Sequence, residues 1–343
     1  MPQLTRIRKK AGRLKREMVQ RFEKCLARKA PRLLLELFAP SAVIIEPTNI
    51  CNLRCALCPT SQSKRKKGRM PLEDLRKIAA ELPSGIQTCH LYLSGEPLLH
   101  DDCFAMVAEL FRLGLKTSLS TNGTRLGGCL DEVMDSPLDE LIIALDGADR
   151  QTYERYRIGG DFDSVVDNIR RLVIARRAQN LHRPRIVLQC LVTRDTEAEL
   201  GAVQELARDL GVDALSFISI SLGTHQTDAA TRRQLAERFL PQDTSFCRYE
   251  RSLKGDYVLK WKRPYCPLWR LPVILWNGDV TACCFDHNGV EVYGNVLEQS
   301  FNDVWRGANH VSVVQRMLPR KMTLCDTCGL TSGDENRHIP LPR

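Results

Sequence analysis

Cysteines are the residues of this 343-residue chain with the clearest capacity for chemistry, and there are 14 of them. Because we find no secretory signal at the basic N-terminus, we expect a reducing compartment, in which cysteines more often bind metals than form disulfides. Three of them occur in the segment Cys51-Asn-Leu-Arg-Cys55-Ala-Leu-Cys58. Three thiolates this close can each bind one iron of a cubane cluster and leave the fourth iron open, which indicates a catalytic centre.

A structural zinc ion is the alternative for these three cysteines. Structural zinc sites usually take cysteine pairs from two separated segments, whereas no fourth cysteine or histidine lies near residues 51–58. The C-x3-C-x2-C spacing therefore favours an iron–sulfur cluster over zinc.

A second group of cysteines lies in residues 263–331. Its members are Cys266, Cys283, Cys284, Cys325 and Cys328. Two apolar runs, Val273–Trp276 and Val280–Cys283, flank Asn277-Gly278, which is the turn chemistry of a two-residue β-hairpin. We therefore predict a small metal-binding subdomain around this hairpin. The spacing alone leaves both an iron–sulfur cluster and a structural zinc ion open.

The elements that must position these cysteines alternate between strand and helix. Six apolar or β-branched runs are predicted to be strands: Ala42–Glu46, Cys89–Leu93, Lys116–Ser120, Glu140–Leu145, Arg185–Val192 and Ala214–Ser219. Helical patterns lie between them near Leu72–Leu82, Asp102–Leu113, Leu126–Asp135, Phe162–Ala178 and Ala198–Leu210. This order implies parallel strands with helical crossovers, closed either as a doubly wound sheet or as a partial barrel. In both folds the chemistry gathers at the C-terminal ends of the strands.

Composition and charge separate a neutral body from a basic N-terminal segment. A hydrophobic fraction of 43% is enough for a large core and excludes general disorder, and no apolar run is long enough for a membrane span. Residues 1–32 contain twelve Lys and Arg against two Glu, a net charge of +10. Because the whole chain carries +9, the other residues sum to −1.

The basic segment also has the pattern of an amphipathic helix. Its apolar residues recur at three- and four-residue steps: Leu4, Ile7, Ala11, Leu14, Met18, Phe22 and Cys25. Three interpretations remain open. The apolar stripe packs on the body, or the helix lies on an anionic membrane surface, or it contacts RNA. RNA contact is the least favoured, because Phe22 is the only aromatic residue available for base stacking.

Taken together, the cysteine segment and the six βα units resemble the radical S-adenosylmethionine (SAM) superfamily over roughly residues 42–222. Ser94-Gly95-Glu96-Pro97 resembles the Gly-Gly-Glu segment of that family, which binds the methionine amino group. Ser120-Thr-Asn122-Gly123 and Leu145-Asp146-Gly147 end strands three and four, where the family lines its SAM pocket. Two departures are Ser94 in place of the first glycine and Ala144 where a serine often stands.

The resemblance implies a fold, a cofactor site and a reaction. The fold is α/β, a partial (β/α)6 TIM-like barrel with a small C-terminal cysteine-rich subdomain. Cys51, Cys55 and Cys58 bind the SAM-binding 4Fe–4S cluster. The expected SAM contacts are Ser94, Gly95, Glu96, Ser120, Asn122, Asp146 and Gln189. Reductive cleavage of SAM would give methionine and a 5′-deoxyadenosyl radical that abstracts a substrate hydrogen.

The second group of cysteines resembles the SPASM and twitch extensions of radical SAM enzymes. Cys266, Gly278 and Cys283 fit the C-x9–15-G-x4-C opening, and Cys325-x2-Cys328 fits its close. This resemblance implies one auxiliary 4Fe–4S cluster on Cys266, Cys283, Cys325 and Cys328, with zinc as the alternative. The remaining Cys247 and Cys284 are candidates for a hydrogen-atom donor, and a small buried apolar residue is the alternative for each.

These inferences define a domain plan and a function. The plan has a basic helical extension (1–40), the radical SAM barrel (41–222), a connector or lid (223–262), the auxiliary-cluster domain (263–331) and a tail (332–343). We predict a cytoplasmic radical SAM enzyme, with contact at the inner face of the membrane through residues 1–32. Oxidation or epimerisation of a carbohydrate- or aminocyclitol-like substrate is placed first and peptide modification second, with a flavodoxin or ferredoxin as reductant. A non-catalytic iron–sulfur or zinc protein is the alternative from another class.

Overall fold

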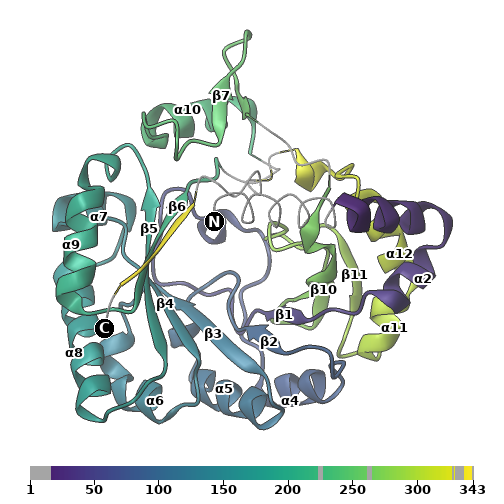
Figure 1. Cartoon of the computed structure of the whole chain (residues 1–343), viewed down its shortest axis with the longest axis horizontal. Coiled ribbons are helices and arrows are strands. Elements are labelled where there is room, and N and C mark those ends of the chain that lie inside the picture. Colours follow the sequence, from purple (N-terminus) through teal and green to yellow (C-terminus); the bar gives the residue numbers. More distant parts are fainter. Residues whose placement is uncertain (1–16, 223–226, 261–264, 327, 329–335, 342–343) are drawn as a thin grey trace, which may run out of the picture.

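The computed structural model describes residues 17–222, 227–260, 265–326, 328 and 336–341, and in these ranges the chain forms an open barrel (Figure 1). Its six parallel strands pair in chain order. They are β1 (Ala42–Ile45), β2 (Thr88–His90), β3 (Lys116–Thr121), β4 (Glu140–Ala144), β5 (Arg185–Val192) and β6 (Ala214–Ser219). The predicted partial (β/α)6 barrel is confirmed, and a doubly wound sheet is not formed.

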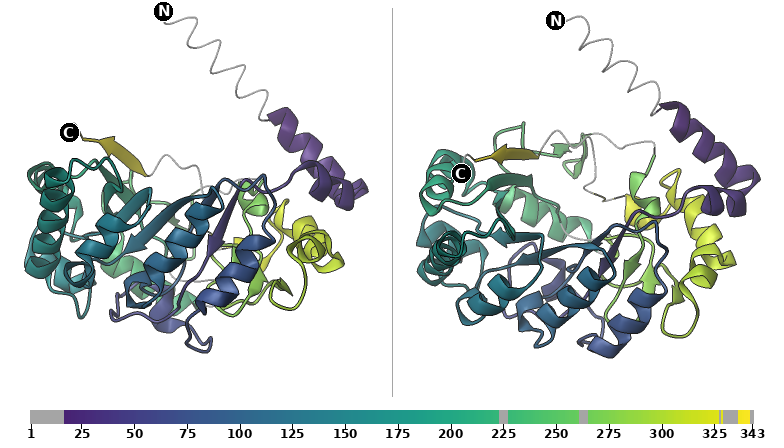
Figure 2. Two further views of the ribbon diagram at one scale, coloured as in Figure 1. Left: turned by 90° about the horizontal axis from the view of Figure 1, so that it is seen from below. Right: turned by 60° about the horizontal axis from the view of Figure 1, so that its bottom comes forward.

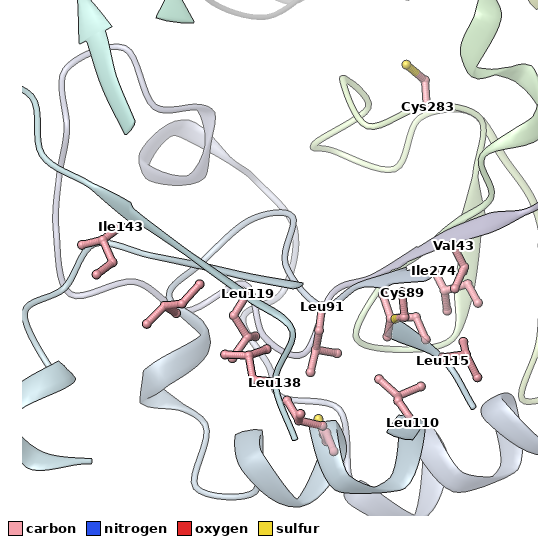
Figure 3. Close-up of a cluster of buried hydrophobic side chains, with 14 of the residues drawn as sticks. Val43, Cys89, Leu91, Leu110, Leu115, Leu119, Leu138, Ile143, Ile274 and Cys283 are labelled. Carbon is pink, nitrogen blue, oxygen red and sulfur yellow. The ribbon is translucent and has the colours of Figure 1, made fainter. Parts of the chain in front are cut away.

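Helices cover the outer face of these strands (Figure 1). They are α4 (Leu72–Ala80), α5 (Cys103–Arg112), α6 (Leu130–Asp135), α7 (Arg150–Tyr156), α8 (Phe162–Ala178) and α9 (Leu200–Leu210). Alternate strand residues such as Leu119, Leu141 and Leu188 point outward and are fully buried beneath the helices. Figure 3 shows part of this core, where side chains of neighbouring strands meet Leu110 of α5.

The C-terminal cysteine-rich region continues the barrel sheet. The predicted hairpin is present as β9 (Val273–Ile274) and β10 (Asp279–Thr281), followed by β11 (Val292–Asn295). Strand β9 pairs in parallel with β1, so a single sheet of ten strands runs from β11 to the other edge of the barrel. Two helices, α11 (Phe301–Arg306) and α12 (Ala308–Met317), lie over this part.

Two segments contain more structure than their sequence patterns indicate. The predicted connector holds α10 (Ala229–Phe239) and an antiparallel hairpin of β7 (Tyr249–Arg251) and β8 (Tyr257–Leu259). The predicted tail contributes β12 (Arg337–Pro340), which pairs antiparallel with β6. The boundaries of the five-part domain plan stay predictions.

The N-terminal segment lies against the C-terminal region and projects away from the barrel (Figure 2). Residues 17–29 are helical, and α2 (Pro31–Leu37) follows. Of the predicted apolar stripe, Leu4, Ile7, Ala11 and Leu14 lie outside the described residues. Met18, which is 70% exposed, does not follow the interpretation that the stripe packs on the body, whereas Phe22, which is 52% exposed, meets the ring of Phe38 with 6.4 Å between centroids. Within the described ranges no helix combines the length and apolar character that crossing a membrane requires.

Candidate active site

The loop after β1 carries Cys51, Cys55 and Cys58 at the C-terminal end of the barrel. The amide of Cys58 donates to the carbonyl of Cys55 at 3.1 Å, and the short helix α3 (Pro59–Gln62) begins directly afterwards. Burial raises the pKa of Cys55 to about 11, and the neighbouring Cys58 and Cys51 add smaller increases. The pKa of Cys51 is also raised, chiefly by burial and in part by Cys58. The structure therefore places the three thiols within electrostatic reach of one another.

The donor set of this loop fits an iron–sulfur cluster. In the part of the chain that the structure describes, no three Cys, His, Asp or Glu side chains converge as a single metal ion would require. A cubane cluster takes one thiolate at each of several corners, so its ligands stand apart. Beside the loop, a cavity of about 400 Å³ is lined by Ile50, Cys51, Leu53, Arg54, Thr60, Ser61 and Lys67.

The segment Ser94–Glu96 packs against residues 48–50, which lead into the cysteine loop. Gly95 has a φ of +77°, and a Cβ atom there would lie 2.5 Å from the carbonyl oxygen of Thr48. The next amide, that of Glu96, donates to the carbonyl of Ile50 at 2.8 Å. Only glycine permits both the left-handed backbone and this close approach. The chain entering the cysteine loop is thus held directly against this segment, while Ser94 beside it is 3% exposed.

Glu96 ties the end of β2 to the end of β3. Its carboxylate accepts hydrogen bonds from the Thr121 hydroxyl at 2.7 Å and from the main-chain amide of Asn122 at 2.6 Å. The side chain is 1% exposed, and burial raises its pKa, while the bonds from Asn122 and Thr121 act in the opposite direction. These contacts make Glu96 a positioning residue for Asn122.

Asn122 connects β3 to the cysteine loop. Its side-chain amide donates to Asn52 Oδ1 at 3.0 Å and lies 3.9 Å from Cys51 Sγ. The side-chain oxygen Oδ1 of Asn122 accepts a hydrogen bond from the Thr124 hydroxyl at 2.7 Å, which fixes the orientation of the side-chain amide. Asn52 was not expected from the sequence, and its position between two cysteines is the signal that could have suggested it.

Asp146 is fully buried after β4 and pairs with a residue that sequence reasoning missed. Its carboxylate accepts from the Leu191 amide at 2.7 Å and from Arg157 Nε at 2.5 Å. Arg157 in turn places Nη1 3.8 Å from Cys55 Sγ. Burial opposes the charge of Arg157, but Asp146 and then Cys55 raise its pKa. Because Arg157 is the third arginine in the polar segment Arg150–Arg157, its sequence alone gives no signal that separates it from Arg150 and Arg155.

Ser120 and Gln189 lie on the inward side of β3 and β5. Each is half-buried and alternates with an outward residue, Leu119 or Leu188, that is fully buried. Gln189 is also the register partner of Ala144, and its carbonyl accepts from the Leu145 amide at 2.8 Å. Both predicted residues therefore face the barrel interior, Gln189 beside Ala144 and Leu145 and Ser120 opposite Ile142.

The four predicted auxiliary ligands come together in the C-terminal region. Cys266, Cys283, Cys325 and Cys328 are all buried. Burial raises the pKa of Cys266 to about 12, with smaller increases from Cys283, Cys328 and Cys325. Cys283 lies on the loop after β10, with its sulfur directed away from the strands (Figure 3). Thiols are the donors of both iron–sulfur and zinc sites, but among the described residues these four, like those of the first loop, do not converge as a single zinc ion would require.

The two leftover cysteines are in different places. Cys284 is half-buried and packs beside Ile44 and Val273, at the inner face of the barrel. Burial, Glu140 and Cys284 each raise the pKa of Tyr92, in that order, so the thiol lies near this tyrosine. Cys247 instead sits in an apolar cluster, and its thiol donates to the carbonyl of Tyr249 at 3.2 Å.

The basic segment after the cysteine loop makes internal contacts. Arg65 donates to both carboxylate oxygens of the fully buried Glu46, at 2.8 and 2.6 Å, and to the carbonyl of His287 at 2.7 Å. Lys67 Nζ donates to the carbonyls of Asn49 and Thr60, each at 3.1 Å. These residues link the cysteine loop to the C-terminal region.

Comparison with known proteins gives two family matches on this chain. Residues 45–198 match the family described as the radical SAM superfamily, and residues 266–329 match SPASM, an iron–sulfur cluster-binding domain. A tungsten-containing aldehyde ferredoxin oxidoreductase cofactor-modifying protein from Pyrococcus furiosus is 25% identical, over 76% of this chain and 79% of the relative. Mycofactocin maturase MftC from Mycobacterium tuberculosis is 26% identical, over 87% of this chain and 79% of the relative.

Solved structures share the fold. SuiB from Streptococcus suis bound to precursor peptide SuiA has a TM-score of 0.61 at 15% identity, over 84% of this chain and 71% of SuiB. BtrN in complex with AdoMet and 2-DOIA has a TM-score of 0.51 at 19% identity, over 84% of this chain and 92% of BtrN.

Proposed function

This chain belongs to the radical SAM superfamily and carries a SPASM domain, and from that premise we propose that it is a maturase that modifies a peptide. It is an enzyme whose cofactors are SAM and iron–sulfur clusters. The observation that carries the peptide assignment is its 26% identity with a mycofactocin maturase across 87% of the chain. An aminocyclitol- or carbohydrate-like substrate is the second candidate, favoured by the fold shared with BtrN.

The proposed cofactor ligands follow from the two groups of thiols. Cys51, Cys55 and Cys58 would hold the SAM-binding cluster. The auxiliary cluster would take the four buried cysteines of the C-terminal region, Cys266, Cys283, Cys325 and Cys328. When bound, the reduced cluster supplies the electron that cleaves SAM to methionine and the 5′-deoxyadenosyl radical, which abstracts a substrate hydrogen.

The chain's own residues orient the cofactors and exclude water. We assign the contact with the SAM amino group to the main chain of Ser94–Glu96, because the carboxylate of Glu96 is already engaged by Thr121 and Asn122. Asp146 would act through Arg157, whose guanidinium it fixes beside Cys55. Ser120 and Gln189 would contact SAM from the inner face of the barrel.

For the hydrogen-atom donor we favour Cys284 over Cys247. Cys284 packs at the inner face of the barrel near Tyr92 and its side chain is hydrogen-bonded to Cys283, whereas Cys247 lies in the apolar cluster that contains Cys55 and donates its thiol to the carbonyl of Tyr249. A thiol at the inner face can return a hydrogen to a substrate radical held there. If the reaction is an oxidation, a cluster held by Cys266, Cys283, Cys325 and Cys328 would supply the acceptor for the substrate electron, and Cys284 would serve as a packing residue.

Two further partners are proposed. The enzyme needs a one-electron reductant such as a flavodoxin or ferredoxin, because reductive cleavage of SAM consumes an electron. A peripheral contact with a membrane through residues 1–32 is supported by their net charge of +10.

The proposed substrate class can be tested with the anaerobically reconstituted full chain, SAM and a reductant. One set of reactions contains precursor-type peptides, and a matched set contains aminocyclitols. Mass spectrometry is expected to find a mass change in a peptide and 5′-deoxyadenosine above the substrate-free level. Turnover of an aminocyclitol with no peptide product would overturn the maturase assignment.

The auxiliary site has its own test. Two clusters predict about eight iron and eight sulfide per chain, whereas a zinc ion at the second site predicts about four of each. A Cys266→Ala/Cys325→Ala variant should lose the auxiliary half of the iron. Iron content unchanged in this variant would contradict the proposed ligands.

A further inference from the structure

The helix at residues 17–29 is attached to the body by a charged and hydrogen-bonded face. Glu23 is 1% exposed, and its carboxylate contacts the hydroxyl of Tyr265 and the guanidinium of Arg270. Trp269 Nε1 donates to the same tyrosine oxygen at 3.0 Å. One turn further along, Ala27 is 3% exposed, and its carbonyl accepts from the side chain of Gln315 at 3.1 Å.

A second side of this helix is apolar and largely open to solvent. Met18 is 70% exposed and Phe22 is 52% exposed, although the ring of Phe22 also meets that of Phe38 edge-on with 6.4 Å between centroids. Met18 and Phe22 are four residues apart and therefore neighbours on one side of the helix. An amphipathic helix normally turns its apolar stripe to the core and its charges to water. Here Leu26 and Ala27 do pack on the core, but Met18 and Phe22 form a second apolar stripe that is exposed, which marks this stripe as an interaction surface.

Positive charge borders the exposed stripe. The basic residues along the described part of the segment are Arg21, Lys24, Arg28, Lys29 and Arg32, and all but the half-buried Lys24 are exposed. The sequence before residue 17 adds seven further Lys and Arg and no acidic residue. Since the remainder of the chain is close to neutral, the charge belongs to this segment alone.

We propose that Met18 and Phe22, with their basic neighbours, form a docking surface for an anionic membrane. Apolar side chains inserted among lipid headgroups, with Lys and Arg beside anionic phosphates, are the combination that holds amphipathic helices at membranes. Single-stranded RNA would need aromatic side chains for stacking, and Phe22 is the only one in residues 1–32. The inference rests on the membrane partnership proposed above and adds the residues and the face that make the contact.

The attachment of this helix sets the orientation of the enzyme at the membrane. Its anchor residues Tyr265, Trp269 and Arg270 flank Cys266, a proposed ligand of the auxiliary cluster, in the sequence. In Figure 2 the helix leaves the molecule on the side of α2 and the C-terminal region. Docking through the exposed stripe therefore places the auxiliary-cluster region, rather than the far side of the barrel near α8, next to the lipid.

The test is flotation of the full, cluster-loaded chain with lipid vesicles. One set contains phosphatidylcholine alone, and the other contains phosphatidylcholine mixed with phosphatidylserine. The variant Met18→Gln/Phe22→Gln removes the exposed apolar stripe and leaves the buried Glu23 and Ala27 of the same helix unchanged. The matched control Ile174→Gln changes a side chain that is 58% exposed on α8. A third variant, Arg28→Glu/Lys29→Glu, reverses two exposed charges.

We expect the wild-type chain and the Ile174 variant to float with the anionic vesicles only, and salt to weaken the binding. The stripe variant and the charge variant should each bind at least about tenfold less. No flotation of the wild type, equal flotation of the stripe variant, or binding to a single-stranded RNA probe without vesicle binding would overturn the proposal. Formation of 5′-deoxyadenosine, measured in parallel, should be unchanged in all variants, so a failure of docking is distinguishable from a failure of the catalytic assignment.

Discussion

Arg157 joins several parts of the candidate site through one side chain. Its guanidinium donates to the fully buried Asp146 and lies 3.8 Å from the sulfur of Cys55. One positively charged side chain therefore contacts both the residue after β4 and the cysteine loop. A buried ion pair gains from its geometry only while both partners are present. Loss of Arg157 would leave the carboxylate of Asp146 buried without its counter-ion.

The variant Arg157→Gln should destabilise the protein by about 3–5 kcal/mol because of that unpaired carboxylate. Anaerobic urea unfolding measures this difference. The matched control is Arg155→Gln, two residues earlier, whose pair with Asp195 is largely exposed at 2.9 Å. Exposed pairs contribute about 0–1 kcal/mol, so equal losses in the two variants would contradict the assigned role of Arg157.

His310 provides a pH-dependent prediction at the same scale. Burial lowers its pKa to about 4, from an ordinary value of 6.5, and the ring stacks on Tyr293 with 4.2 Å between centroids. The folded state therefore favours the neutral ring. The contribution of His310 to the free energy of unfolding is complete above pH 6.5 and is lost as the pH falls toward 4, at up to about 1.4 kcal/mol per pH unit.

The variant His310→Gln should remove that part of the pH dependence. Unfolding free energies of both proteins, measured between pH 7 and 5, should therefore converge as the pH falls. Parallel curves would show that His310 does not carry the effect.

At the scale of elements, the strands of the barrel were predictable and several helices were not. Strands β5 and β6 match their predicted bounds because alternating positions face the helices and the interior. Helix α7 has only seven residues, too few to show a clear period, and α10 lies in a polar stretch. Strand β12 forms because β6 offers an unpaired edge, a cause that its own residues do not reveal.

The same contrast holds within the candidate site. The cysteine positions follow from local spacing. The contacts of Glu96 with β3 and of Arg157 with Cys55 depend on residues 25 and 102 positions apart in the chain, so only the folded structure brings them together. The second strand was predicted to reach Leu93 but ends at His90, because the chain turns there toward the positive-φ residue Gly95.

Gly95→Ala tests how the segment after β2 supports the cysteine loop. The added methyl group would lie 2.5 Å from the Thr48 carbonyl oxygen, so the loop must move and iron binding at the first cluster should fall. The control Gly114→Ala has a similar φ of +80° with no heavy atom within 4 Å of the new methyl, and should cost about 1 kcal/mol without loss of iron. Iron analysis separates the two, and equal iron content would argue against the role of Gly95.

At the scale of the whole molecule, the pairing of β9 with β1 joins both cysteine groups to one sheet. The contacts of Arg65 with Glu46 and His287 add a second link between the cysteine loop and the C-terminal region. The two proposed cluster sites are therefore parts of one rigidly connected structure, which suits electron transfer between a substrate and the auxiliary site.

This continuity predicts a single cooperative unfolding transition. All four tryptophans lie in residues 261–305, so their fluorescence reports on the C-terminal region, whereas far-ultraviolet circular dichroism reports mainly on the barrel helices. The two signals should change at the same denaturant concentration. Separate midpoints would show that the barrel and the C-terminal region unfold independently.

The most direct test of the catalytic assignment is the formation of 5′-deoxyadenosine from SAM after anaerobic reduction. The wild-type chain should produce it, and Cys51→Ala, Cys55→Ala and Cys58→Ala should not, because each removes a proposed cluster ligand. The control Cys25→Ala, at an exposed position on the N-terminal helix, should retain the activity. No product from the wild type, or equal product from the Cys51→Ala variant, would contradict the account.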